Sequence, residues 1–193
     1  MMNHSKESIQ EKALKIKLVI FDVDGVLTDG TLSYSAEGES IKHFNVKDGL
    51  GIKLLMSHGI DVAVISARQS LPLQRRMDDL GIQYFFSGVH NKLHAFDQLI
   101  QQLNIKAEEV AYVGDDVIDV PVMKRVGLSC TVQDGYALVK EAADWVTESA
   151  GGAGAAREVA DLILSSKMAL RDAYHFLLNP DQDKRDNPSE ASG

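Results

Sequence analysis

Cysteine and long apolar runs are scarce in this sequence of 193 residues. The single Cys130 cannot form an internal disulfide, and its apolar context, "GLSCTV", predicts a buried and unreactive thiol. No window approaches the roughly 18 apolar residues that a membrane span requires, and the first residues, "MMNHSKESIQEKALKIK", lack the apolar segment of a signal peptide. We therefore expect a protein of a reducing, cytoplasmic compartment with no membrane partner.

Basic residues are also fewer than acidic ones. Lys and Arg number 20 against 28 Asp and Glu, and the resulting net charge of −8 disfavours a nucleic-acid partner. Hydrophobic residues make up 45% and charged residues 25% of the chain, as in ordinary soluble proteins, and the length suits one domain. Beyond Pro180 the sequence "DQDKRDNPSEASG" has no large apolar residue. It predicts a disordered tail over 180–193 after a single domain over 1–179.

Short apolar runs alternate with helix-like segments along the rest of the chain. Several runs are apolar on both faces, as expected of parallel strands covered by helices on each side. The alternation predicts an α/β fold with a doubly wound, Rossmann-like, mostly parallel sheet. The predicted strands cover residues 18–22, 61–66, 82–87, 110–115, 128–132 and 144–147.

Three helices between these strands have recognisable ends. Asp48 is expected to cap a helix that stops at Gly59, and a second helix runs from Leu71 to Gly81. Asn91 opens a third, "NKLHAFDQLIQQLN", whose apolar residues share one face. These helices supply the crossovers that a parallel sheet needs.

Residues 30–46, "GTLSYSAEGESIKHFNV", interrupt the alternation and predict a β-hairpin inserted after the first strand. Its apolar residues Leu32, Tyr34, Ile41 and Phe44 alternate with polar ones, and a two-stranded ribbon cannot bury them alone. The segments between the motifs described below are too short for a cap domain. We therefore expect the hairpin to build a closed homo-oligomer, a tetramer; the alternative is that it folds back onto its own domain.

Polar residues follow the predicted strands where each one ends. Ligands of open α/β sheets bind at the carboxyl ends of the strands, so these residues are candidates for a site. Helices also begin there, and their free N–H groups favour an anion. The candidates are Asp22, Asp24, Ser66, Arg68, Lys92, Asp115, Asp116 and Asp119.

The clustering of so many Asp residues at the strand ends suggests a binding site for a metal ion and a phosphate group. Clustered carboxylates raise one another's pKa unless a cation lies among them, and Mg²⁺ prefers oxygen ligands. With the charge offset, one Asp can attack phosphorus and form an aspartyl-phosphate. A Ser hydroxyl and a Lys ammonium can balance the charge on the transferring group.

The segments "FDVDGVLTDG", Ser66, Lys92 and "VGDDVIDVP" resemble, in order, the four motifs of the haloacid-dehalogenase superfamily of phosphatases. The resemblance implies that Asp22 is the nucleophile. It implies that Asp24 is the general acid and base and lends its backbone carbonyl to Mg²⁺. Ser66 and Lys92 would hold the phosphoryl group. The resemblance further assigns Asp115 to the metal site of Asp22 and Asp24, with Asp116 and Asp119 supporting it from behind.

A closer resemblance covers nearly the whole chain. "FNVKDGLGIKLL", "VISAR", "AYVGDDVIDVPVM" and "ESAGGAGAAREVADLIL" are similar to the 3-deoxy-D-manno-octulosonate 8-phosphate (KDO 8-phosphate) phosphatases. This family releases KDO and phosphate in lipopolysaccharide biosynthesis, and its members lack a cap and form tetramers. Lys53 stands where relatives carry Arg, and Arg75 is an alternative to Arg76. By this resemblance the substrate contacts are Asp24, Asn45, Val46, Lys47, Asp48, Gly49, Lys53, Arg68, Arg76 and Lys92.

Each of these residues also has a structural interpretation. Asp22 and Asp24 could be turn residues before a glycine, as Asp29 is expected to be before Gly30. Lys92 could be a solvated lysine, although it stands at the helix end that favours anions. The glycines of "AGGAGAARE" (150–158) lack the Lys and Ser/Thr of a P-loop, and we interpret them as a turn before the last helix.

Three classes of function remain open at this point. The first is a Mg²⁺-dependent phosphatase for KDO 8-phosphate. The second is a related phosphatase for another sugar phosphate, such as an acylneuraminate 9-phosphate. The third is a non-catalytic oligomeric scaffold, which has no use for clustered acids.

Overall fold

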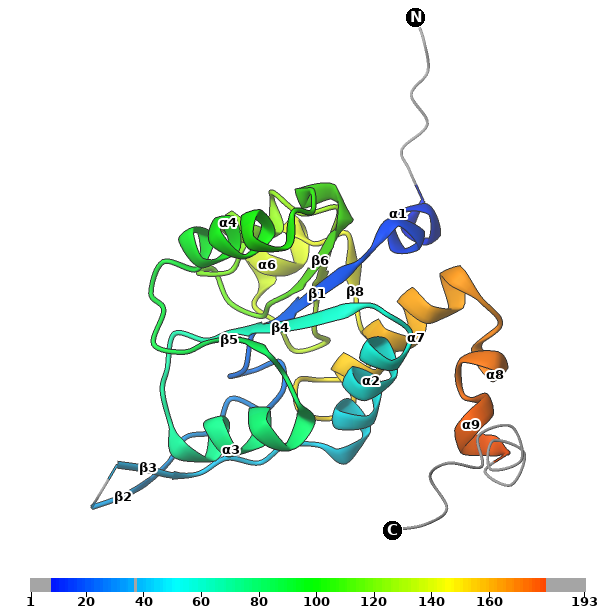
Figure 1. Cartoon of the computed structure of the whole chain (residues 1–193). Coiled ribbons are helices and arrows are strands. Elements are labelled where there is room, and N and C mark those ends of the chain that lie inside the picture. The colour runs from blue at the N-terminus through cyan, green and yellow to red at the C-terminus, as the bar shows by residue number, and fades with distance from the viewer. Residues whose placement is uncertain (1–7, 37, 180–193) are drawn as a thin grey trace, which may run out of the picture.

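A computed structural model describes residues 8–36 and 38–179 and shows a parallel six-stranded sheet (Figure 1). The strand order is β5-β4-β1-β6-β7-β8, and every neighbouring pair is parallel. The predicted α/β class with its parallel sheet is thereby confirmed, whereas the predicted tail, 180–193, lies outside the described residues. The strands are β1 (Leu18–Phe21), β4 (Asp61–Ile65), β5 (Tyr84–Phe86), β6 (Val110–Val113), β7 (Leu128–Thr131) and β8 (Trp145–Val146).

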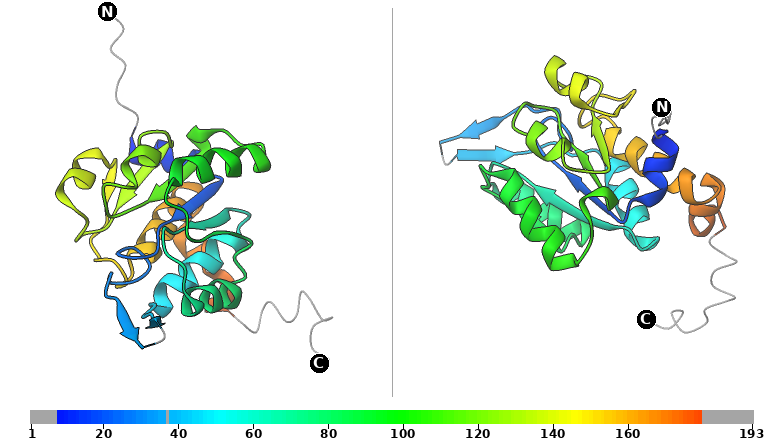
Figure 2. Two further views of the ribbon diagram at one scale, coloured as in Figure 1. Left: turned by 90° about the vertical axis from the view of Figure 1, so that its left-hand side faces the viewer. Right: turned by 90° about the horizontal axis from the view of Figure 1, so that it is seen from above.

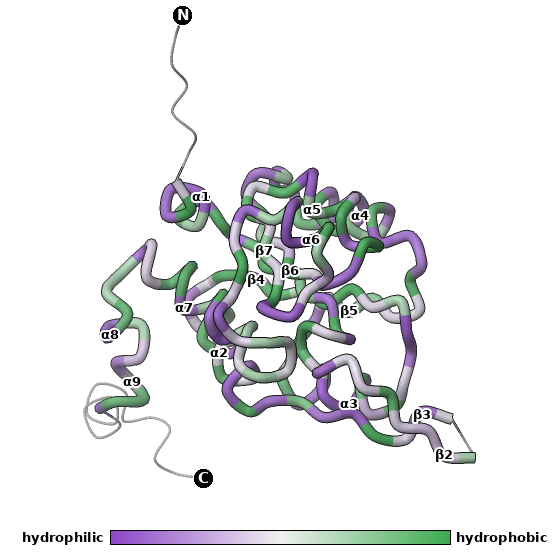
Figure 3. The backbone as a smooth tube through the Cα atoms, turned by 180° about the vertical axis from the view of Figure 1, so that it is seen from behind, coloured by the Kyte–Doolittle hydropathy of each residue, from purple (hydrophilic) through white to green (hydrophobic). Residues whose placement is uncertain are grey.

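The central strands are buried on both faces, which explains their continuous apolar sequences. Along β1, Val19 and Phe21 point into one hydrophobic cluster while Leu18 and Ile20 point into the other. Figure 3 shows the hydrophobic (green) backbone gathered in this sheet. Because close-packed cores cover both faces of the sheet, the residues at the carboxyl ends of its strands are held rigidly.

Helices cover each face (Figure 1). The first cluster contains residues of α1, α2, α3 and α7, and the second contains residues of α4, α5 and α6. No helix in the described part of the chain is long and apolar enough to cross a membrane. The helices are α1 (Ile9–Lys15), α2 (Val46–Ser57), α3 (Leu71–Leu80), α4 (Lys92–Leu103), η1 (Ala107–Glu109), α5 (Val120–Met123), α6 (Ala137–Ala142), α7 (Ala155–Lys167), α8 (Leu170–Ala173) and α9 (His175–Leu178).

The predicted start of α3 at Leu71 and the predicted ends at Gly81 and Asn91 are confirmed, α2 ends two residues before the predicted Gly59, and the predicted cap of α2 is wrong. Gly81 ends α3 in the left-handed conformation, and the Asn91 side chain caps α4. The predicted cap at Asp48 is incorrect, because the Asn45 side chain accepts the N–H of Lys47 and α2 begins at Val46. Asp48 instead lies inside α2, buried against another helix.

The predicted hairpin is present as an antiparallel pair, β2 (Ser33–Ser35) and β3 (Gly38–Ile41). It forms a sheet of its own and extends away from the domain (Figure 2). Tyr34 and Ile41 are 63% and 52% exposed, as an interaction surface requires. The assignment of Phe44 to that surface is wrong, because its ring packs against the domain core and under the Arg76 guanidinium.

Candidate active site

The parallel register brings the ends of neighbouring strands to one level. Phe21 pairs with Val64 of β4 and with Val113 of β6, and the Asp22 N–H donates to the Val113 carbonyl at 2.9 Å. The Ser66 N–H likewise donates to the carbonyl of Phe86, 2.8 Å away. The backbone ladders therefore continue just past the strands and hold Asp22 and Ser66 firmly at the edge of the sheet.

Lys92 lies between two carboxylates at this edge. Its Nζ is 2.7 Å from Asp22 Oδ1 and 2.7 Å from Asp119 Oδ1, and its side chain is 1% exposed. The Tyr112 hydroxyl donates to the same Asp119 oxygen at 2.6 Å. Lys92 is thus a buried ammonium paired with two acids, and the interpretation as a solvated lysine does not hold.

The electrostatics of this edge depart from those of ordinary surface acids. Burial raises the pKa of Asp115 to about 8, and the charge of Asp22 adds to the rise. Burial also raises the pKa of Asp22 to about 6, although Lys92 opposes the rise. Burial alone would lower the pKa of Lys92, but Asp22 and Asp119 outweigh it and raise that pKa. The site has more negative charge than its own cation offsets.

Asp22, Asp115 and Asp119 form a group that fits a metal ion. One carboxylate oxygen from each lies within 4.8 Å of the others. Asp119 is the least available, since its oxygens accept from Lys92, Tyr112 and the N–H groups of Asp115 and Asp116. Asp115 Oδ1, in contrast, is buried without a hydrogen-bond partner in the described structure. A hard cation beside Asp22 and Asp115 would satisfy that oxygen.

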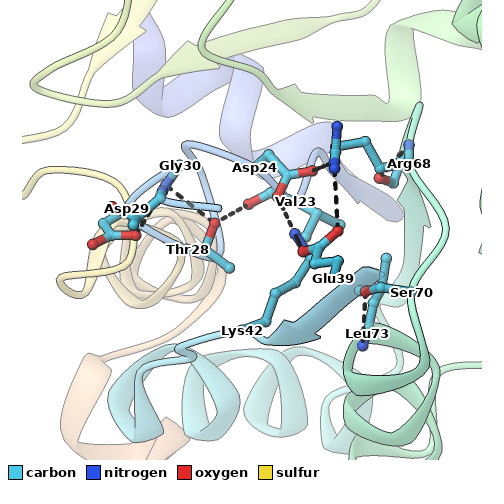
Figure 4. Close-up of polar contacts among 12 residues, drawn as sticks. Val23, Asp24, Thr28, Asp29, Gly30, Glu39, Lys42, Arg68, Ser70 and Leu73 are labelled. Carbon is cyan, nitrogen blue, oxygen red and sulfur yellow. Dashed lines mark hydrogen bonds and ion pairs between the residues drawn. The ribbon is translucent and has the colours of Figure 1, made fainter. Parts of the chain in front are cut away.

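The Asp24 carboxylate points to a different set of partners (Figure 4). Its Oδ1 contacts the ammonium of Lys42, and its Oδ2 lies 3.9 Å from Arg68 Nε. Lys42 also binds Glu39 at 2.7 Å. The Arg68 guanidinium contacts Glu39 at 3.4 Å and the Tyr34 hydroxyl at 2.5 Å. Asp24 is therefore tied to the hairpin rather than to the three-carboxylate group.

Ser66 follows β4, the strand that pairs with β1, and stands two residues before Arg68. It is 1% exposed, and its Oγ accepts the N–H of Arg68 at 3.2 Å. Within the described residues the Ser66 hydroxyl proton has no acceptor. Ser66, Lys92, Asp22 and Asp115 together present a hydroxyl, an ammonium and two carboxylates, which are the kinds of group that transfer of a phosphoryl group needs.

Comparison with known proteins agrees with this chemistry. Residues 85–159 match the family model of the haloacid dehalogenase-like hydrolases. The chain is 50% identical over 159 residues to 3-deoxy-D-manno-octulosonate 8-phosphate phosphatase KdsC of Haemophilus influenzae, covering 82% of this chain and 88% of that protein. The chain belongs to the KDO 8-phosphate phosphatase family. The resemblance inferred from the four motifs is confirmed.

Two solved structures of the KDO 8-phosphate phosphatase family carry metals. The cobalt-bound Haemophilus influenzae enzyme superposes with a TM-score of 0.79 at 51% identity, covering 81% of this chain and 91% of that one. The Moraxella catarrhalis enzyme, in complex with magnesium, phosphate and KDO, has a TM-score of 0.83 at 36% identity and covers 94% and 100%. The described residues of this chain form no separate cap domain.

The predicted substrate-contacting segment 45–49 divides into inward and outward residues. Asn45 caps α2 and donates to the Gly152 carbonyl at 3.1 Å. Asp48 accepts the N–H of Arg157 at 3.0 Å, and Gly49 leaves room for the Arg76 guanidinium. Val46 and Lys47 are exposed. The inward residues hold the segment against α7 and α3, and the outward ones face solvent.

The remaining predicted site residues have different partners and exposures. Arg76 donates to the Asn45 carbonyl at 3.4 Å, whereas the neighbouring Arg75 lines a groove between α3 and the hairpin. Lys53 is exposed on α2. Asp116 is exposed and accepts the N–H of Val117. Arg68 Nε lies 3.9 Å from Asp24 Oδ2, and the roles of these residues toward a substrate stay predictions.

Sequence reasoning did not single out Lys42, Glu39 or Tyr112 for the site. Lys42 and Glu39 belong to a hairpin in which charged residues usually face water, and Tyr112 looks like an ordinary core aromatic of β6. A signal existed for Tyr112, because its hydroxyl in a doubly buried strand needs a partner. Nothing in the local sequence indicated that Lys42 reaches Asp24.

Proposed function

We propose that this chain is a Mg²⁺-dependent phosphatase that hydrolyses KDO 8-phosphate to KDO and phosphate through an aspartyl-phosphate. The observation that carries the proposal is the orphaned, buried Asp115 Oδ1 beside Asp22 and Lys92, in a member of the KDO 8-phosphate phosphatase family. The complex of the Moraxella catarrhalis relative with magnesium, phosphate and KDO supports the choice of metal and product.

In the first step, a carboxylate oxygen of Asp22 forms a bond to phosphorus while the bond from phosphorus to the sugar oxygen breaks. Asp24 gives its proton to the departing sugar oxygen. In the second step Asp24 takes a proton from water, which attacks phosphorus and releases phosphate from Asp22. Each step leaves Asp22 and Asp24 ready for the next, so the cycle needs no other reactant.

Ser66 and Lys92 are the donors we assign to the transferring group. The Ser66 hydroxyl follows β4, the neighbour of β1, and the Lys92 Nζ is 2.7 Å from Asp22 Oδ1, so we assign both as donors to oxygens of the phosphoryl group. Mg²⁺ would be held by Asp22, Asp115 and the backbone carbonyl of Asp24, and when bound it neutralises charge on the acids and the phosphate. Asp119 fixes Lys92 and accepts the N–H groups of Asp115 and Asp116, and we assign Asp116, which accepts the N–H of Val117, to the support of the same loop.

We assign recognition of the acidic sugar to cations and polar groups at the rim. Arg68 is the most accessible charged group beside Asp24, with 38% of its side chain exposed. Lys47 and Val46 are exposed at the start of α2, and Arg76 holds the segment in place. Lys53 contributes long-range positive charge.

We further propose a cytoplasmic homotetramer whose hairpins pack around a symmetry axis. The exposed Leu32, Tyr34 and Ile41 support this arrangement, since a free ribbon would leave them in water. The unpaired Cys130 thiol suits a reducing compartment. Light scattering tests the tetramer: Ile41→Asp is expected to shift the mass to smaller species, and an active wild-type monomer would refute it.

The test of the function is phosphate release from a panel of sugar phosphates, measured as kcat/KM with Mg²⁺ and after chelation. We expect kcat/KM for KDO 8-phosphate to exceed kcat/KM for an acylneuraminate 9-phosphate by about a hundredfold or more. A site whose buried polar groups match one substrate discriminates to this extent. A preference for the second substrate would refute the assignment within the phosphatase class. No turnover of any ester with Mg²⁺ would refute the class itself.

A further inference from the structure

Lys42 is a second buried lysine that the mechanism above does not use. We propose that Lys42, braced by Glu39, is a positioning residue for Asp24: it holds one carboxylate oxygen so that the other faces the leaving oxygen of the substrate. The inference rests on the proposed function, in which Asp24 donates and accepts the proton. It assigns a role in catalysis to the hairpin of the same chain.

The burial of Lys42 is unusual for its place in the chain. It directly follows β3, in a ribbon whose neighbours Tyr34 and Ile41 are mostly exposed, yet only 1% of its side chain is exposed. Glu39, which pairs with it at 2.7 Å, has a side chain that is 5% exposed. Buried ammonium groups occur in proteins when they are paired with acids. The hairpin therefore places the Lys42 ammonium inside the domain, against the carboxylates of Asp24 and Glu39.

The two carboxylate oxygens of Asp24 have different partners. Oδ1 is held by the Lys42 ammonium (Figure 4). Oδ2 lies 3.9 Å from Arg68 Nε, which is beyond hydrogen-bonding distance, and that Nε is buried with no hydrogen-bond partner in the described structure. Oδ2 is therefore the oxygen that is free to carry the proton to the sugar oxygen.

Two other roles for Lys42 fit the structure less well. A direct substrate contact requires exposed surface, and the side chain has almost none. A role as a base requires a neutral amine. The Lys42 ammonium is paired with the carboxylates of both Asp24 and Glu39, and this pairing stabilises its charged form. What remains is a fixed cation that orients Asp24.

The reaction itself offers a readout for this role. In the first step the bond from phosphorus to the leaving oxygen breaks, and that oxygen takes the proton of Asp24. A sugar alkoxide needs this proton, whereas the 4-nitrophenolate ion leaves without it. Since kcat/KM reports only the steps up to formation of the aspartyl-phosphate, a misplaced Asp24 lowers it for the sugar phosphate far more than for 4-nitrophenyl phosphate.

The experiment compares kcat/KM for the two esters in wild type, Lys42→Met and Glu39→Gln, with Mg²⁺ present. We expect Lys42→Met to lose about tenfold to a hundredfold on the sugar phosphate and less than about threefold on 4-nitrophenyl phosphate. Glu39→Gln should shift the ratio in the same direction by a smaller factor, and it provides the test if Lys42→Met fails to fold. Asp24→Asn removes the proton donor itself, so it sets the largest change expected in the ratio of kcat/KM between the two esters.

Lys12→Met is the matched control. Lys12 of α1 forms a partly buried pair with Asp144 at 2.5 Å, and none of the hydrogen bonds of this pair involves Asp22, Asp24 or Asp115, so its loss should lower thermal stability without changing the ratio of kcat/KM between the esters. Equal losses on both esters in Lys42→Met and Glu39→Gln would overturn the positioning role and leave the proposed function intact. A wild type that hydrolyses neither ester would overturn the function, and this role with it.

Discussion

Asp22 and Asp24 are two residues apart, yet each is held by a different buried lysine. Lys92 joins Asp22 to Asp119, and Lys42 joins Asp24 to Glu39. The partners of Asp22 come from the ends of the sheet and from α4, whereas the partners of Asp24 come from the inserted hairpin and the loop after β4. The Asp24 side chain is 21% exposed against 8% for Asp22.

The difference matches the demands of the two proposed roles. A nucleophile has to lie in line with phosphorus, and Asp22 follows a strand whose ladders are fixed by two cores. A proton donor and acceptor has to meet the sugar and then water, and Asp24 sits nearer the solvent. The inserted hairpin can therefore change the orientation of Asp24, the proposed acid and base, without moving Asp22, the proposed nucleophile.

Asp22→Asn provides the strongest test of the comparison. The amide is a poor nucleophile, so we expect turnover to fall more than about a thousandfold, or about 4 kcal/mol in the barrier. Circular dichroism should show an unchanged fold. Radiolabelled phosphate trapped on the wild-type chain at low pH should map to Asp22, and a label elsewhere would contradict the assignment.

Removal of the metal is the next test, and its pH dependence is specific. Chelation should abolish turnover and Mg²⁺ should restore it. Burial raises the pKa of Asp115 to about 8 and of Asp22 to about 6 from 3.8, so between about pH 4 and pH 8 the folded chain binds more protons than the unfolded chain. The metal-free protein should therefore lose stability as pH rises through this window.

Mg²⁺ competes with those protons. The Mg²⁺-induced rise in Tm should accordingly be larger near about pH 8 than near about pH 5. Thermal unfolding with and without Mg²⁺ at both pH values measures it. An equal rise at both values would mean that the metal binds away from Asp22 and Asp115.

Lys92→Met should cost stability as well as rate. It leaves Asp22 and Asp119 buried without their cation, a change of about 3–5 kcal/mol in the free energy of unfolding. The double variant Lys92→Met/Asp119→Leu should recover much of that stability but none of the activity, because the phosphoryl group still lacks its donor. Recovery of turnover in the double variant would show that Lys92 is purely structural.

Tyr34→Phe should have the smallest effect. It removes one hydroxyl that binds Arg68 at 2.5 Å and keeps the ring of the exposed surface. The loss of one such hydrogen bond corresponds to about 0.5–1.5 kcal/mol, so KM should change by less than about tenfold with kcat nearly constant. A loss in kcat comparable to that of Lys42→Met would place Tyr34 in the Asp24 network.

Much of the fold followed from local patterns. Apolar runs gave all six strands, and Gly81 and Asn91 mark helix ends because their conformations and side chains satisfy helix termini locally. The α2 boundary was mispredicted because Asn45 and Asp48 are both good caps. Only the packing of α7 on α2 shows that the Asp48 side chain instead accepts a hydrogen bond from the N–H of Arg157.

The sequence by itself determined the parallel sheet, the family and the order of the acids, since periodicity and motif spacing are properties of neighbouring residues. It also placed Asp22, Ser66, Lys92 and Asp115 at one edge, because parallel strands end together. Tertiary structure alone decided that Asp119 belongs with Lys92, that Asp115 keeps an orphaned oxygen, and that Lys42 turns inward to Asp24. Such pairings depend on burial and on contacts between segments far apart in the chain, and no local pattern encodes them.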